Sequence, residues 1–328
     1  VWIGGAKNST VALIPASILS RTPVTLEGVP RIADVINLMD LLSEMDVHCD
    51  FGETTLCIDP TDIKMSPLPA GKIKSLRASY YFMGALLGRF GKAVVGFPGG
   101  DDIGPRPIDQ HIKGFEALGA SVKNENDQII ITAPEDGLHG AKIHLKMPSV
   151  GATMNIIMAS VTAQGQTIIE NAAKEPEIID LATFLNNMGA VIRGAGNDSI
   201  GIECVDILKA QIPHTISPDR IEAGTYVSLA ACIGNGIRTH ILQIESAIVA
   251  HPHLILGAKR LKCIIVVERR LVFLYWRQGL RLLIGILGST YSLIQSLNSI
   301  ITLTRLGVCH FLLFLFRFQV FGHCIGIC

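Results

Sequence analysis

The stretch DVINLMDLLSEMDVHCDFGETTLCID, residues 34–59, decides the fold, because a helical pattern is followed there by two short strands. Apolar residues first recur every three or four positions, and they then alternate with polar ones. The same order returns in HIKGFEALGASVKNENDQIIITA and in IDLATFLNNMGAVIRGAGNDSIGIEC. The three turns fall near Asp46, Gly119 and Gly189. A spacing of about 70 residues between copies indicates an internal repeat.

A second pattern alternates with the first: a turn of small residues, an apolar helix and a β-branched strand. Residues 5–29, 76–100 and 149–172 carry it, and a fourth copy begins at Glu222 without being completed. These helices have apolar residues on more than one face, which is typical of helices buried on all sides. Each unit therefore has the order βαβαββ. We predict an inside-out α/β barrel, with the helices packed inside a ring of sheets.

The composition favours a small-molecule ligand. The chain has 328 residues, enough for two domains, and its 28 Lys and Arg balance its 28 Asp and Glu. This balance gives no indication of a nucleic-acid partner. Eight cysteines show no C-x-x-C pair and no metal-ligand spacing, so we expect no metal. We expect reduced core thiols, with Cys57, Cys204 and Cys232 among them, in a cytoplasmic protein.

The last part of the chain differs from the rest. From Arg238 onward there are ten Lys or Arg and only two acidic residues. Two apolar runs begin at Leu282 and His310; polar residues interrupt the first, and Arg317 lies near the middle of the second. Either the tail associates with a membrane, or it was never selected as protein, as in translation past a frameshift. The interruptions favour the second interpretation.

The stretch FPGGDDIGPRPIDQHIKGFEALGA, residues 97–120, contains the residues best suited to chemistry. Glycines and two acids before a helix can form a loop that brings a carboxylate over a ligand, and Pro107 and Asp109 are good residues for a helix start. The alternative is an ordinary acidic connection between a strand and a helix. Composition alone does not decide between them.

This stretch resembles the catalytic loop of the UDP-N-acetylglucosamine 1-carboxyvinyltransferases, which belong to the enolpyruvyl transferases. GGAKNS, LRAS, KMPSVGAT, NAAKEPEIIDLATFLNNMGA and PDRIEAGT match the same family in the same order, over residues 3 to about 237. The related shikimate-pathway enzymes differ at the first motif, where Lys-Ser replaces Lys-Asn. The resemblance implies transfer of the enolpyruvyl group from phosphoenolpyruvate to the 3′-hydroxyl of UDP-N-acetylglucosamine, which begins peptidoglycan synthesis. It also implies no cofactor and a monomer.

The resemblance implies three catalytic residues. Lys7 and Arg106 match cations that bind the phosphoenolpyruvate anion. Asp101 stands where most members carry a cysteine that acts as general acid, and a carboxylic acid with a raised pKa can transfer the same proton. Since fosfomycin alkylates that cysteine, the resemblance also implies fosfomycin resistance.

The remaining matched positions are implied to bind substrate. Asn8 accompanies Lys7 at phosphoenolpyruvate, and the others match contacts to the nucleotide sugar: Arg77, Pro107, Ile108, Asp109, Gln110, Lys146, Ser149 and Val150. His111 follows these at a helix start, and we expect a polar surface residue there without a role.

The family pattern divides the chain into four parts: residues 1–7 as a remnant of a second domain, 8–218 as a complete first domain, 219–237 as the start of the second, and 238–328 as the unmatched tail. The family's P-T-D-x-Q-A motif, which carries its proposed base, does not occur in the tail. We therefore expect impaired catalysis. The alternative is a non-catalytic UDP-sugar-binding domain with a membrane-associating tail.

Overall fold

A computed structural model describes residues 3–66, 80–96, 108–125 and 128–233, with side chains as far as residue 226. Beyond these, it describes the backbone of one antiparallel sheet made of β12 (Ala250–His251), β13 (Lys262–Val267), β14 (Arg270–Arg277) and β15 (Arg281–Leu287). Apart from β15, the two apolar runs of the tail lie outside the described residues. Within the described residues, no helix has the length and apolar character needed to span a membrane.

Contacts divide the chain into two units, and each is described by itself. One is Gly5–Ser217, and the other combines Val1–Gly4 with Pro218–Cys328 and includes helix α8 (Arg220–Ile233). The first unit contains α1 (Lys7–Ala16), η1 (Ser17–Leu19), β1 (Val24–Glu27), α2 (Ala33–Ser43), β2 (His48–Phe51), β3 (Thr55–Asp59), α4 (Tyr81–Phe90), β4 (Lys92–Gly96), α5 (Asp109–Ala117), β5 (Ser121–Glu125), β6 (Gln128–Thr132), β7 (Lys142–His144), α6 (Val150–Ser160), β8 (Gln166–Glu170), α7 (Pro176–Asn187), β9 (Val191–Arg193), β10 (Ser199–Glu203) and β11 (His214–Thr215).

The predicted repeat is confirmed. Helices α2, α5 and α7 are each followed by a turn and two antiparallel strands. The turn residues Asp46, Gly119 and Gly189 all have positive φ, at 60°, 93° and 102°. Left-handed backbone at the same place in each copy sends the chain from the helix into its first strand.

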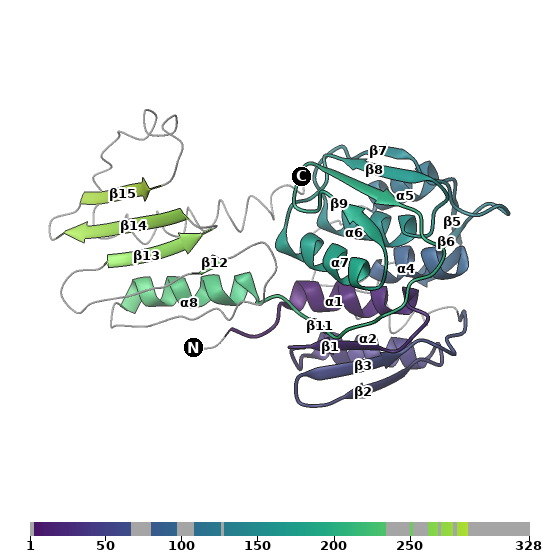
Figure 1. Cartoon of the computed structure of the whole chain (residues 1–328), viewed down its shortest axis with the longest axis horizontal. Coiled ribbons are helices and arrows are strands. Elements are labelled where there is room, and N and C mark those ends of the chain that lie inside the picture. Colours follow the sequence, from purple (N-terminus) through teal and green to yellow (C-terminus); the bar gives the residue numbers. More distant parts are fainter. Residues whose placement is uncertain are drawn as a thin grey trace. The chain divides into compact units, whose positions relative to one another are not determined.

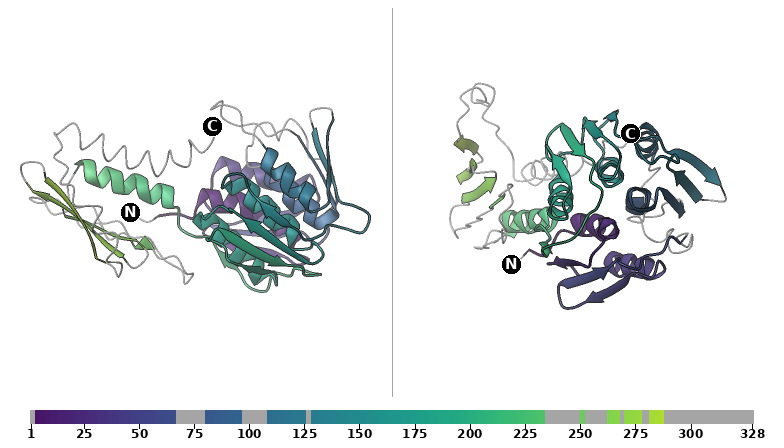
Figure 2. Two further views of the ribbon diagram at one scale, coloured as in Figure 1. Left: turned by 90° about the horizontal axis from the view of Figure 1, so that it is seen from above. Right: turned by 45° about the vertical axis from the view of Figure 1, so that its right-hand side comes forward.

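Three sheets surround the helices of this unit (Figures 1 and 2). Their strand orders are β11-β1-β3-β2, β4-β6-β5 and β7-β8-β10-β9. Strand β11 comes from the end of the unit and lies parallel to β1, with His214 opposite Leu26. The first and last parts of the unit therefore share one sheet.

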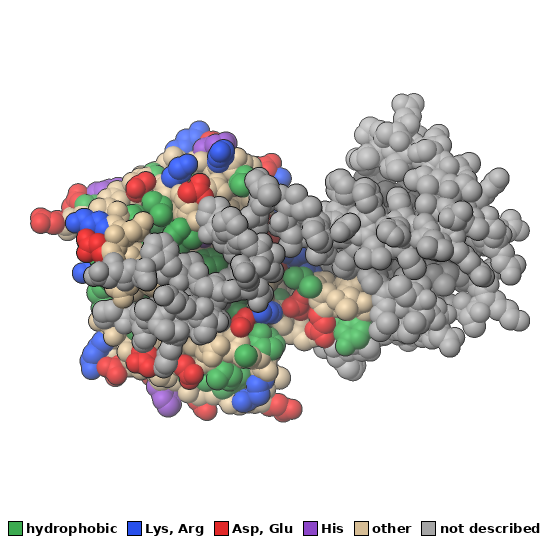
Figure 3. Space-filling view, turned by 180° about the vertical axis from the view of Figure 1, so that it is seen from behind, with side chains coloured by type: hydrophobic (Ala, Val, Ile, Leu, Met, Phe, Trp, Pro, Cys, Tyr) green, Lys and Arg blue, Asp and Glu red, His purple; other side chains and the backbone are tan. Residues whose placement is uncertain are grey.

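The core lies among the helices, as the sequence predicts. Helices α1, α4 and α6 are buried along most of their length, whereas α2 and α5 alternate buried and exposed residues and α7 mixes buried with half-buried ones. Gly84 of α4 approaches α6 so closely that a Cβ there would lie 2.3 Å from the carbonyl oxygen of Asn155. In Figure 3 the visible surface of this unit intersperses Lys and Arg with Asp and Glu.

Candidate active site

The first turn of α1 carries the predicted pair Lys7 and Asn8. From Ser9 to Ala16 the helix is buried, so these two residues form its polar start. The Lys7 ammonium lies 2.6 Å from a carboxylate oxygen of Asp34, and the Asn8 amide donates to Glu177 at 3.4 Å. Both side chains are thus held by carboxylates at a helix N-terminus, where backbone N–H groups and the helix dipole favour an anion.

Gly5 lies two residues before this helix, where there is no room for a side chain. A Cβ on Gly5 would lie 1.9 Å from the carbonyl oxygen of Gly28, which no side chain tolerates. The backbone of the GGAKNS segment therefore passes directly over the end of β1. This close approach fixes where α1 begins.

The predicted nucleotide-sugar residues gather at the starts of α5 and α6. Ile108 packs on the core, Asp109 opens α5, and the buried Gln110 accepts a hydrogen bond from the N–H of Met147 at 3.2 Å. Ser149 caps α6 by accepting from the N–H of Ala152 at 3.3 Å, which places Val150 as the first helical residue. The hydrogen bond from Met147 to Gln110 joins the two helix starts.

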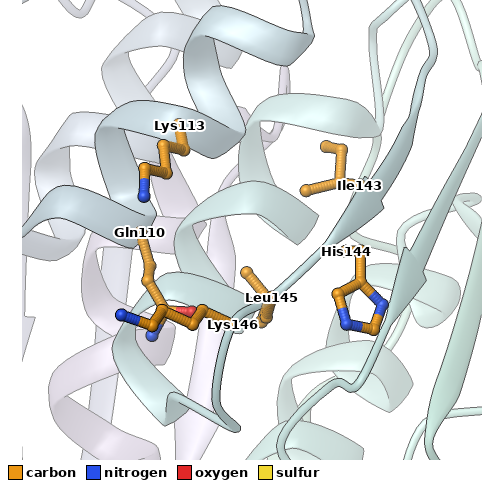
Figure 4. Close-up of a pocket in the computed structure, with 6 residues that line it drawn as sticks. All are labelled: Gln110, Lys113, Ile143, His144, Leu145 and Lys146. Atoms are coloured by element: carbon orange, nitrogen blue, oxygen red, sulfur yellow. The ribbon is translucent and has the colours of Figure 1, made fainter.

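A pocket of about 430 Å³ opens beside this junction and is lined by Gln110, Lys113, Ile143, His144, Leu145 and Lys146. Figure 4 shows the first two side chains extending from α5 and the others from β7 and the segment after it. Lys113 lies 3.9 Å from Asp109, and His144 lies 3.6 Å from Glu170. Two ammonium groups and an amide around one pocket can bind an anion such as a diphosphate.

His111 is buried, so the prediction that it is a surface residue is wrong. Its side chain is only 7% exposed, and its ring packs edge-on against Tyr80 at 5.5 Å. Within the described residues, neither ring nitrogen has a hydrogen-bond partner. Burial lowers the pKa of His111 to about 4 against the opposing charge of Asp109, so the ring is neutral at pH 7.

Two further outcomes concern the predicted residues. Cys57, expected in the core, is exposed, while Cys204 is half-buried and the side chain of Cys232 lies outside the described residues. The predicted Arg77, Asp101, Arg106 and Pro107 also lie outside the described residues. No group of three or more His, Cys, Asp or Glu side chains suited to a metal occurs within the part that is described.

Sequence reasoning missed the carboxylates that hold the first turn of α1. Asp34 and Glu177 contact Lys7 and Asn8, although they are 27 and 169 residues away in the chain. One signal was present, since EPEIIDL places acids three residues apart in an otherwise apolar helix. An acid at such a position is buried and needs a partner.

Comparisons with known proteins agree with this architecture. The chain matches the EPSP synthase (3-phosphoshikimate 1-carboxyvinyltransferase) family over residues 1–266. Over 240 residues it is 94% identical to the UDP-N-acetylglucosamine 1-carboxyvinyltransferase of Lactobacillus acidophilus, covering 73% of this chain and 56% of the relative. The enzyme of the same name from Lactobacillus johnsonii is 89% identical, with 73% of this chain and 57% of the relative covered. The chain thus spans about half the length of the curated relatives it matches.

Solved structures share the fold. The enolpyruvyl transferase NikO from Streptomyces tendae superposes with a TM-score of 0.61 at 22% identity, covering 70% of this chain and 54% of that one. The EPSP synthase from Acinetobacter baumannii gives 0.57 at 18% identity, with 70% and 52% covered. Sequence and fold lead to one conclusion: this chain belongs to the EPSP synthase (3-phosphoshikimate 1-carboxyvinyltransferase) family.

Proposed function

We propose that this chain serves the transfer of the enolpyruvyl group from phosphoenolpyruvate to the 3′-hydroxyl of UDP-N-acetylglucosamine, with release of phosphate. The observation that carries the proposal is the 94% identity over 240 residues to a relative named for this activity. Because the chain spans 56% of that relative, binding of each substrate is tested separately from turnover. In a cell this reaction begins peptidoglycan synthesis.

Phosphoenolpyruvate binding is assigned to the start of α1. An ammonium at Lys7 and an amide at Asn8 suit the phosphate and carboxylate of this substrate, and the helix N-terminus adds backbone donors. Arg106 is proposed as a second cation for the same anion. Its planar fork can form two parallel hydrogen bonds with a carboxylate or phosphate.

UDP-N-acetylglucosamine binding is assigned to the starts of α5 and α6. The proposal is supported by the basic pocket that includes Gln110 and Lys146, and by the capped first turn that follows Ser149. A diphosphate beside that turn would accept hydrogen bonds from backbone N–H groups. The other proposed contacts are Arg77, Pro107, Ile108, Asp109 and Val150.

The reaction needs a group that gives a proton to C3 of phosphoenolpyruvate in the first step and takes a proton back from C3 in the second. In the addition step the sugar oxygen forms a bond to C2 and gives up its hydroxyl proton to a base or to solvent water, while C3 gains a proton, which gives a tetrahedral adduct. Loss of phosphate from C2 and of a proton from C3 then leaves an enol ether. Asp101 is proposed as the group that protonates C3, and since it is not a thiol, turnover should persist in fosfomycin.

The test uses the full chain and titrates each substrate by calorimetry, followed by an assay of phosphate release. Lys7→Ala should weaken phosphoenolpyruvate binding and Lys146→Ala should weaken UDP-N-acetylglucosamine binding, each by about tenfold or more, since a charge-assisted hydrogen bond contributes about 1.5–3 kcal/mol. Lys123→Ala, which removes an exposed lysine of β5 that is not among the proposed binding residues, is the matched control. Phosphate release that disappears in Asp101→Asn supports the full proposal, and binding without release restricts the chain to substrate binding. Absence of binding to either substrate rejects it.

A further inference from the structure

Helix α7 directs two carboxylates, three residues apart, at the start of α1. Glu177 is 3% exposed and Asp180 is 8% exposed. Glu177 accepts a hydrogen bond from the Asn8 side chain at 3.4 Å. A carboxylate buried to this degree is unfavourable unless its oxygens accept hydrogen bonds. The partners of Asp180 therefore show what this residue holds in place.

Asp180 accepts from three residues far away in the chain. One oxygen lies 2.9 Å from Nε2 of His214, and the other accepts from the backbone N–H and the hydroxyl of Ser217 at 3.2 and 2.8 Å. A hydrogen bond from Ser9 adds to these. Although burial alone would raise the pKa of Asp180, the bonds from His214, Ser9 and Ser217 lower it, so the group is an ionised acceptor at neutral pH.

These partners lie on both sides of the candidate phosphoenolpyruvate residues. The carbonyl of Ser217 accepts from the N–H of Ala6 at 2.8 Å, immediately before Lys7. The hydroxyls of Ser217 and Ser9 lie 3.3 Å apart, immediately after Asn8. One carboxylate thus holds the residues that precede and follow the pair. Contact of Lys7 and Asn8 with a ligand is itself part of the proposed function.

We propose that Asp180, oriented by His214, is a positioning residue that fixes the first turn of α1 and thereby aims Lys7 and Asn8 at the phosphoenolpyruvate anion. His214 is 5% exposed, belongs to β11 and packs edge-on against Phe184 at 5.3 Å, so its ring is held from both sides. Strand β11 pairs with β1, so the positioning extends to the sheet that closes the unit. The identity of the ligand in this inference rests on the proposed function. The positioning of the helix start rests on the hydrogen bonds alone.

The first test needs no ligand. Asp180→Asn keeps the shape of the side chain but removes its charge and replaces one acceptor oxygen with an amide N–H₂, so the hydrogen bonds from His214 and Ser217 cannot all be kept at their present strength. Hydrogen exchange of the Ala6 amide in the full chain should then be faster by about tenfold or more. Exchange of the Val29 amide, which donates to the carbonyl of Thr54 in the turn between β2 and β3, should stay the same. Ser217→Ala, a milder change, should show the same direction if Asp180→Asn does not fold. Unchanged exchange at Ala6 in a folded variant overturns the proposal.

The second test measures affinity for each substrate alone. Asp180→Asn should weaken phosphoenolpyruvate binding by about tenfold, the loss expected for one charged hydrogen bond, and leave UDP-N-acetylglucosamine binding unchanged. In a Lys7→Ala background its effect should be smaller, because only Asn8 is left to position. Asp198→Asn, which removes an exposed carboxylate paired with Lys174, is the control. Equal weakening of both ligands would overturn the positioning role in favour of a general loss of structure.

Failure of the proposed function gives a different result from failure of this inference. If the parent chain does not bind phosphoenolpyruvate while Asp180→Asn still loosens Ala6, the assignment of the ligand is wrong and the positioning of the helix start stands. If the parent binds and Asp180→Asn binds equally well, Asp180 does not position Lys7 and Asn8.

Discussion

At the scale of single residues, two buried ionisable groups weaken the fold in acid over different pH ranges. His111 has a folded pKa of about 4, against an ordinary value of 6.5 for histidine. The unfolded chain therefore binds the extra proton first, and stability is complete above pH 6.5 and lost as the pH falls toward 4. The shift corresponds to about 3 kcal/mol of unfolding free energy.

Replacing His111 with Phe should remove this pH dependence, because a ring is kept against Tyr80 and no proton can bind. Urea denaturation at about pH 7 and about pH 5 measures the difference. The parent should lose stability between these values and His111→Phe should lose much less. His139→Phe, at an exposed histidine paired with Asp136, is the control and should retain the parent's slope. An identical slope in His111→Phe would contradict the prediction.

Asp180 contributes over a lower range of pH. Its folded pKa is depressed, so its stabilisation is present above the ordinary value of 3.8 and is lost as the pH falls through the folded pKa. Asp180→Asn should cost about 3 kcal/mol at neutral pH, since removing one member of a buried pair leaves the other without its partner. As the pH falls below 3.8, the difference between variant and parent should narrow. Acid titrations followed by circular dichroism would show it, and a constant difference would argue against an ionised Asp180.

At the scale of helices and strands, the sequence predicts local order well and predicts distant partners poorly. The turn at Asp46 follows from a local change of period, and the structure confirms it with a φ of 60°. Residue type alone predicts a buried Cys57, and this prediction is wrong. Its neighbours Leu56 and Ile58 are the buried positions of β3, so strand alternation would have placed Cys57 outside. His111 could not be placed in this way, because the ring against which it packs belongs to Tyr80, in another helical segment.

The contact between α4 and α6 gives a prediction at the same scale. Alanine normally favours a helix over glycine by about 1 kcal/mol, yet Gly84→Ala should destabilise the chain by about 2 kcal/mol. The added Cβ would lie 2.3 Å from the Asn155 carbonyl oxygen, and Asn155 also accepts from the Gly84 N–H at 2.7 Å. Gly201→Ala is the control, since nothing lies within 4 Å of its added Cβ. Chemical denaturation of both variants compares them, and equal midpoints would contradict the close approach.

At the scale of the whole molecule, the unit Gly5–Ser217 has the features of an independently folding domain. Its core is continuous, and its last strand, β11, pairs with its first, β1. Produced alone, residues 5–217 should therefore unfold in one cooperative transition, because all three sheets and the Asp180–His214 pair are retained. A chain that ends at residue 212 is the matched control. It loses β11 and His214, exposes the edge of β1 and leaves Asp180 buried without its partner, so its midpoint in urea should fall sharply. If both chains unfold at the same midpoint, β11 does not close the domain, and the positioning assigned to Asp180 loses its structural basis.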